Sequence, residues 1–168
     1  AGRQEGFQEA IFNPITSVDA SHDVDLEGNF DGKDSTNGAE GFTRDEMVQY
    51  VSPSMSGLTV GISAQPNAAN TKKADDTEFM VKYSNAGLMV AANVASEADI
   101  DYTTVIASYK MGDLEVRAGS RTEEATTGDL DSTFVGAKYT MGANTFSVGS
   151  VSTDNDNGDA TVVGLAHA

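Results

Sequence analysis

The sequence predicts an all-β protein whose strands run antiparallel, up and down, through one sheet. A segment of alternating apolar residues that ends in Tyr, then a Gly-containing turn, then a second alternating strand, occurs three times. The segments that end in Tyr are residues 79–83, 105–109 and 135–139, and a fourth copy begins at Val163. Alternation with a period of two residues, bounded by turn residues, indicates hairpins in a sheet with one apolar and one polar face.

The two predicted faces differ in chemistry. In each strand, alternate residues share a face, and we call the set that includes the tyrosines the apolar parity. Followed through every strand, this set is rich in Val, Ala and Leu and contains no charge. The opposite parity collects Ser, Thr, Gly and charged residues, including Lys82, Lys110, Arg117, Arg121 and Lys138, so we expect that face to be wet. A soluble sandwich would also alternate, but large interdigitating side chains would fill its core. We therefore expect lipid to cover the apolar face.

The two ends of the predicted strands also differ. Tyr83, Tyr109 and Tyr139 are each the last residue of the apolar parity before a short turn, where an amphipathic ring suits one aromatic girdle of a membrane boundary. The opposite ends are joined by long polar links, which we place at 66–77, 123–131 and 152–159. Short turns at one end and long extracellular loops at the other are typical of outer-membrane barrels. The predicted fold is an antiparallel up-and-down transmembrane β-barrel.

Composition excludes several classes of protein. The chain has 168 residues, no Cys and a net charge of −16, so one domain is expected and disulfides, thiolate metal sites and thiol catalysis are excluded. Nucleic acid is not an expected partner, because it would require a basic surface. Neither His22 nor His167 lies near a plausible Ser or carboxylate pair, and we expect no enzyme.

No cofactor is expected either, with one alternative left open. Asp154, Asp156 and Asp159 form an acidic run that departs from the EF-hand pattern, because residue 153 is Thr and no Glu follows at the twelfth position. A weak surface calcium site is the alternative.

Two motifs resemble a known family. The stretch from Tyr50 to Gly61 is similar to the segment of Gram-negative general-diffusion porins in which a Tyr, a Ser-Pro turn and a Gly-hydrophobic strand follow the third loop. Gly2-Arg3-Gln4 resembles the strand end before that loop. The resemblance implies a 16-stranded barrel, usually a homotrimer, of which 1–168 is part of one barrel domain. Residues 1–4 would be a strand end, 5–43 an inward-folding third loop, and 44–168 consecutive hairpins.

The same resemblance implies a pore constriction, with acids on the third loop opposed by arginines on the wall. By position, Arg3 and Arg44 match wall arginines, although Arg44 shares the parity of the apolar face. Parity alone turns Arg117 and Arg121 inward. The loop acids are Asp19, Asp23, Asp25, Glu27 and Asp31.

About nine or ten strands can be counted, so we expect an interior part of a longer porin. The predicted function is passive diffusion of small hydrophilic solutes and ions through a water-filled channel in the outer membrane of a Gram-negative bacterium. The bilayer and lipopolysaccharide would be its surroundings. The alternative is a soluble or surface-attached β-structural protein, such as an adhesin or filament subunit, whose apolar face packs on another sheet.

Overall fold

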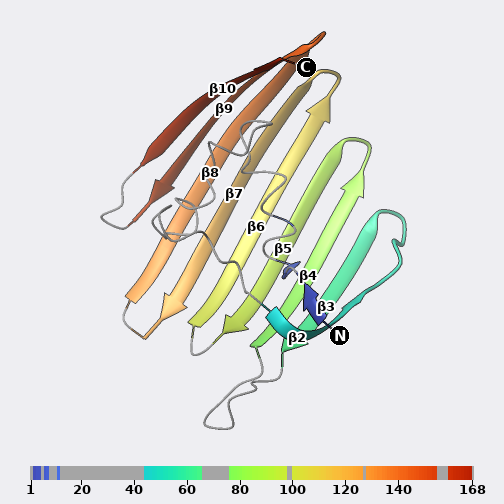
Figure 1. Cartoon of the computed structure of the whole chain (residues 1–168), viewed down its shortest axis with the longest axis vertical. Coiled ribbons are helices and arrows are strands. Elements are labelled where there is room, and N and C mark those ends of the chain that lie inside the picture. Colours follow the sequence, from blue (N-terminus) through green and yellow to red (C-terminus); the bar gives the residue numbers. More distant parts are fainter. Residues whose placement is uncertain are drawn as a thin grey trace.

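In the computed structural model the chain forms one antiparallel sheet of ten strands, in the order β1 to β10 (Figure 1). Each strand pairs with its neighbours in the sequence, so the topology is an up-and-down meander. The structure describes residues 2–4, 6–7, 11, 44–65, 76–97, 100–126, 128–154 and 159–167. The prediction of an all-β, antiparallel, up-and-down fold is confirmed. No helix among these residues is long and apolar enough to cross a membrane.

The strands lengthen toward the middle of the sheet and shorten again at β9 and β10. Their bounds are β1 Gly2–Gln4, β2 Arg44–Val51, β3 Leu58–Gln65, β4 Asp76–Asn85, β5 Leu88–Glu97, β6 Ile100–Met111, β7 Leu114–Ala125, β8 Gly128–Met141, β9 Asn144–Thr153 and β10 Ala160–His167.

Tight turns join the strands at one end of the sheet, which we call the short-turn end. The links are residues 52–57, 86–87, 112–113 and 142–143. Gly112 and Gly142 have φ of 61° and 60°, as the first central position of a type II′ hairpin turn requires. Ala86 and Gly87 both have positive φ, at 49° and 86°, which is the type I′ pattern whose twist matches that of the flanking strands.

The links 52–57, 86–87 and 112–113 are also bonded to the next hairpin. The Lys110 N–H donates to the Gly87 carbonyl over 2.9 Å, and the Thr140 N–H donates to the Asp113 carbonyl over 3.0 Å. The hairpins are therefore staggered: Tyr83 and Ala107 both pair with Val90, so Tyr109 lies two residues further along. A regular stagger of this kind tilts the strands, as closure of a barrel requires.

The apolar parity points away from the rest of the chain. We call this side the outer face; on it Ile62, Val94 and Val135 are 55%, 51% and 59% exposed. The opposite parity forms the inner face, where Met80, Ile106 and Phe134 are buried. A continuous exposed apolar surface of this extent indicates a membrane contact. The sequence prediction assigned these two parities in the same way.

One expected loop is a hairpin instead. The link predicted at 123–131 is paired strand, because β7 continues to Ala125, β8 begins at Gly128, and only residues 126–127 separate them. The Thr122 hydroxyl donates to the Asp131 carboxylate over 2.7 Å across this pair. Strands of 12 and 14 residues exceed the roughly 9–11 needed to cross hydrocarbon, so the polar composition marks a paired extension and not a loop.

The assignment of the outer face predicts an asymmetric response to charge along one strand. Val105→Lys on the outer face of β6 should lower the free energy of unfolding in bilayers by about 2–4 kcal/mol, because a cation near mid-bilayer faces lipid. Ser108→Lys, three residues away on the inner face, should cost much less. Denaturant titration of the protein folded in phospholipid vesicles measures both, and equal losses would contradict the assignment.

Candidate functional site

A polar row crosses the inner face at mid-strand. Asn93, Thr104, Arg121 and Ser132 are successive register partners on β5, β6, β7 and β8. All four are buried, Asn93 at 1% and Thr104 at 0% exposure. Within the described part of the chain, neither the Asn93 amide nor the Thr104 hydroxyl has a hydrogen-bond partner. The row combines hydrogen-bond donors, acceptors and one permanent cation.

Arg121 is held in this row by two neighbours. Its guanidinium carbon lies 4.8 Å from the centroid of the Tyr102 ring, within the range of a cation–π contact. Its Nη2 lies 3.7 Å from Oε2 of Glu123 on the same strand. The ring contact and the ion pair together fix the position of the planar guanidinium in the row.

Arg117 lies two register rows closer to the short-turn end. Its Nε donates to Oε1 of Glu115 over 2.8 Å, and its side chain is only 9% exposed. Its register partners are Ser108 and Gly136. Both arginines therefore point to the inner face, as parity predicts, and each has a carboxylate two residues away on its own strand.

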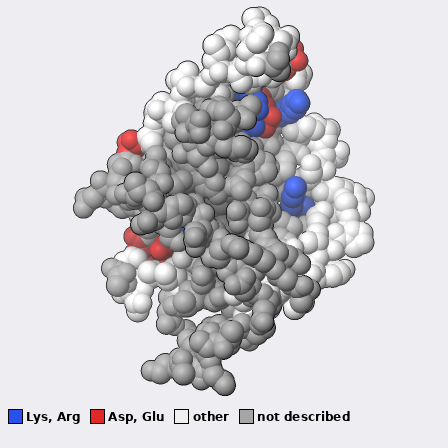
Figure 2. All heavy atoms as spheres, viewed as in Figure 1, with Lys and Arg blue, Asp and Glu red and all other residues white. Residues whose placement is uncertain are grey.

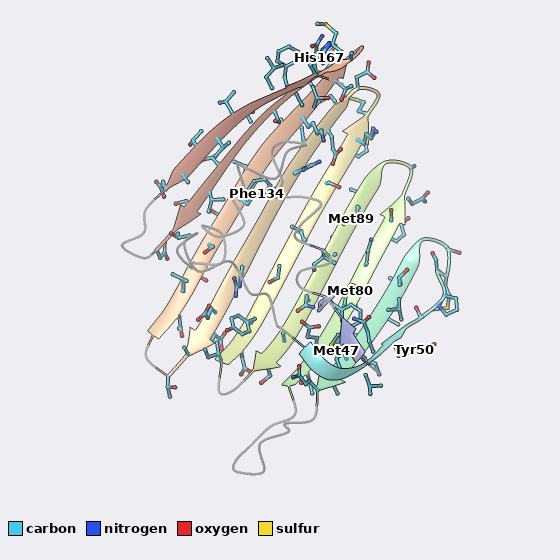
Figure 3. The ribbon with its side chains drawn as sticks, in the orientation of Figure 1. Met47, Tyr50, Met80, Met89, Phe134 and His167 are labelled. Atoms are coloured by element: carbon cyan, nitrogen blue, oxygen red, sulfur yellow. The ribbon has the colours of Figure 1, made fainter. Side chains whose placement is uncertain are left out.

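An apolar cluster lies beside the polar row on the inner face, and the sequence analysis missed it. Met80, Ala91, Ile106, Phe134 and Val151 are inner-face residues of five strands that pack with Phe7 and Ile11 from the segment after β1. Met80, Met89 and Phe134 are seen across the middle of the sheet in Figure 3. The inner face, which was expected to be wet, is apolar at these positions, because apolar residues occur on the polar parity as well. These positions hold Phe7 and Ile11 against the wall.

Polar contacts fix Phe7 at the same place. The buried Glu78 carboxylate accepts a hydrogen bond from the Phe7 N–H over 2.8 Å and another from the Ser63 hydroxyl over 3.0 Å. The Phe7 ring lies over Gly61, where an added Cβ would come within 2.6 Å of the ring. A buried carboxylate requires such donors, so Glu78 and Gly61 together specify one position for the start of the segment 5–43.

Several predicted site residues fall outside the described part of the structure. The loop acids Asp19, Asp23, Asp25, Glu27 and Asp31 lie there, as does Asp156. Arg3 is in β1 and Arg44 begins β2, but their side chains are also outside it. Their part in a constriction stays a prediction, as does the proposed calcium run.

The predicted tyrosines are on the outer face beside the tight turns. Tyr83, Tyr109 and Tyr139 are exposed, and Tyr139 pairs with Leu114 and Phe146. His167 takes the corresponding position on β10, where its Nδ1 lies 2.9 Å from Oδ1 of Asn144 (Figure 3). Their role as a girdle stays a prediction, and their placement agrees with it.

The missed inner-face residues had a signal in the sequence. Lys82, Ala91, Ile106, Gly119, Phe134 and Val151 form one register row. The signal is that Ala91, Ile106, Phe134 and Val151 are apolar residues on the polar parity, and the stagger of the hairpins brings them to one level. An apolar group at one level of a wet face indicates that something packs on it.

A meander with an exposed apolar outer face and a polar, partly basic inner face is the wall of a transmembrane β-barrel. A family model described as a Gram-negative porin matches residues 1–167. The chain belongs to this porin family and is a protein of the outer membrane of a Gram-negative bacterium. The predicted family and location are confirmed.

Among solved structures, the chain is similar to "OmpTdeltaL8 (loop L8 deletion mutant of OmpT), an outer membrane protein of Vibrio cholerae". The TM-score is 0.68 at 18% sequence identity, and the match covers 98% of this chain and 62% of that chain. At this identity the likeness shows the fold alone. The chain therefore spans 62% of the length of that barrel. Comparison with curated protein sequences gave no significant match.

The docking of Phe7 predicts how the following segment responds to truncation of its ring. Phe7→Ala should cost roughly 3–5 kcal/mol locally, the usual loss for a buried Phe, and should speed trypsin cleavage after Lys33. Phe146→Ala is the matched control, because Phe146 lies on the outer face and is 45% exposed. Mass spectrometry of the cleaved protein measures both rates; equal acceleration, or none for Phe7→Ala, would show that Phe7 does not hold the segment.

Proposed function

We propose that the chain lines a water-filled channel through which small hydrophilic solutes and ions diffuse passively across the outer membrane. The observation that supports this most strongly is the inner face itself, where Arg117 and Arg121 stand on a wall whose opposite side is apolar and exposed. Membership of the porin family supports the same function. The transport involves no chemical step, since the wall acts only through its shape and charge.

The polar row of the inner face supports contact with water or polar solutes. An unpaired buried polar group costs about 1–3 kcal/mol. The Asn93 amide and the Thr104 hydroxyl, which lack partners within the described residues, are therefore more stable against water or a solute hydroxyl than against apolar groups. Arg121, their neighbour in the row, adds a fixed positive charge to the same level.

The segment 5–43 is the proposed constriction loop. Phe7 and Ile11 pack on the inner face, and the Phe7 backbone is bonded to Glu78, which supports a segment that starts on the pore side of the wall. We propose that Asp19, Asp23, Asp25, Glu27 and Asp31 then face the wall arginines across the pore. A transverse field between opposed charges orients dipolar solutes and disfavours apolar ones.

We further propose that the protein is a homotrimer in contact with lipopolysaccharide. Family membership supports an oligomer, and the exposed outer face supplies an apolar surface for neighbouring barrels or lipid. Calcium bound by the acidic residues Asp154, Asp156 and Asp159 is an additional proposal, which chelation with EDTA during lipopolysaccharide binding would test. In the described part of the chain, no group of three or more candidate ligands for a metal lies together.

Charge neutralisation at the constriction should change ion selectivity in opposite directions. Arg3→Gln with Arg121→Gln should shift the reversal potential toward cations, and Asp23→Asn, Asp25→Asn and Glu27→Gln together should shift it toward anions. Both shifts should shrink with added salt, because the screening length falls from about 10 Å at 0.1 M to about 3 Å at 1 M. Planar bilayers under a salt gradient give these potentials.

The control for this measurement is Arg121→Lys, which keeps the charge and should leave the reversal potential nearly unchanged. Unchanged potentials for both neutralised proteins would show that these residues do not line the constriction. Absence of any ion current through correctly folded protein would contradict the proposed channel.

A further inference from the structure

A second basic site lies on the inner-face row next to that of Arg117, at the short-turn end of the sheet. Lys110, Glu115 and Lys138 are register partners on β6, β7 and β8. They line a cavity of about 330 Å³ together with Asp113, Thr140 and Thr145. This volume is at the lower end of the roughly 300–1,000 Å³ typical of small-molecule sites. Basic and acidic side chains lie next to each other near the upper, short-turn end in Figure 2.

The lining of this cavity carries two lysines and two carboxylates, Asp113 and Glu115. Glu115 lies between the two lysines, but the bond of its Oε1 is to Arg117 Nε, at 2.8 Å. Within the described residues, neither the Lys110 nor the Lys138 ammonium forms an ion pair. The two ammonium groups are therefore available to an anion that enters the cavity.

The available donors match an oxyanion. Lys110 and Lys138 flank β7, so their backbones are roughly 10 Å apart, two strand spacings, and each flexible stem can bring its ammonium toward the centre. The Thr140 and Thr145 hydroxyls share a hydrogen bond of 3.5 Å on the same wall, which leaves one hydroxyl proton as a further donor. Ammonium and hydroxyl donors that converge on one cavity bind phosphate or carboxylate oxygens through charge-assisted hydrogen bonds.

We propose that this cavity is an oxyanion-binding site at the short-turn mouth of the barrel, formed by Lys110 and Lys138 with the hydroxyls of Thr140 and Thr145. Short turns of outer-membrane barrels face the periplasm, so the site takes up phosphate-like or carboxylate solutes from that side. Lysines that keep their hydration bind weakly, and weak binding lets a permeating ion leave. The binding itself rests on the cavity; its effect on permeation rests on the proposed channel.

Binding of inorganic phosphate by the purified full-length protein in detergent tests the site without any current. Isothermal titration calorimetry should show a dissociation constant that rises about threefold to fivefold in each of Lys110→Gln and Lys138→Gln, the range expected for an exposed ion pair. Lys82→Gln is the matched control. It removes the same charge from the inner face at β4, outside the cavity, and should leave binding unchanged.

Three results would overturn the proposal: no phosphate binding, binding that neither cavity variant weakens, or equal weakening by Lys82→Gln. Equal weakening by Lys82→Gln would show a general electrostatic effect of the inner face.

Single-channel recording then tests from which side of the membrane phosphate reaches the site. Phosphate added on the periplasmic side should block current at a lower concentration than phosphate added outside, and Lys110→Gln should reduce that difference. Block that is equal from the two sides would place phosphate elsewhere in the pore. A protein that binds phosphate but conducts no ions would support the site and contradict the channel.

Discussion

Hydrogen bonding of the backbone in lipid is the constraint on which the rest of this structure depends. Hydrocarbon offers no partner for N–H and C=O groups, so each strand must be satisfied by its neighbours. The continuous pairing from β2 to β10 provides these hydrogen bonds. It also places alternate side chains on opposite faces of the sheet. The apolar parity must then meet lipid, and the other parity the interior of the barrel. Arg117 and Arg121 line the wall because of their parity on β7, and not because of any local motif.

The inner face has a second task, because it must also hold a segment of its own chain. A wall of polar residues alone would offer Phe7 and Ile11 no apolar contact. The cluster around Ile106 and Phe134 supplies it at one level, while Glu78 bonds the Phe7 N–H. Gly61 and Met80, which contact this segment, are in the register row of Arg121. The residues that anchor the segment and the polar residues of the wall therefore lie on different strands of the same rows.

The sequence was sufficient for the strands, their order, the two faces and the inward direction of Arg117 and Arg121, because all of these follow from a period of two. The pairing of Arg117 with Glu115 could also have been predicted, since residues two apart on a strand share a face. The anchoring cluster was not found, because it depends on the relative register of five strands. The extension of β7 and β8 through Thr122 and Asp131 was missed for another reason: polar residues pair as well as apolar ones once a strand leaves the membrane.

Site-directed spin labelling along β7 tests the division into two faces most directly, and the absence of native Cys allows a single label at each residue from Leu114 to Arg121. In vesicles, labels at Val116, Ala118 and Ser120 should be accessible to oxygen, which concentrates in lipid. Labels at Arg117 and Gly119 should be much less so, which gives an oxygen profile with a period of two residues. A profile without that period, or one with the two sets exchanged, would contradict the account.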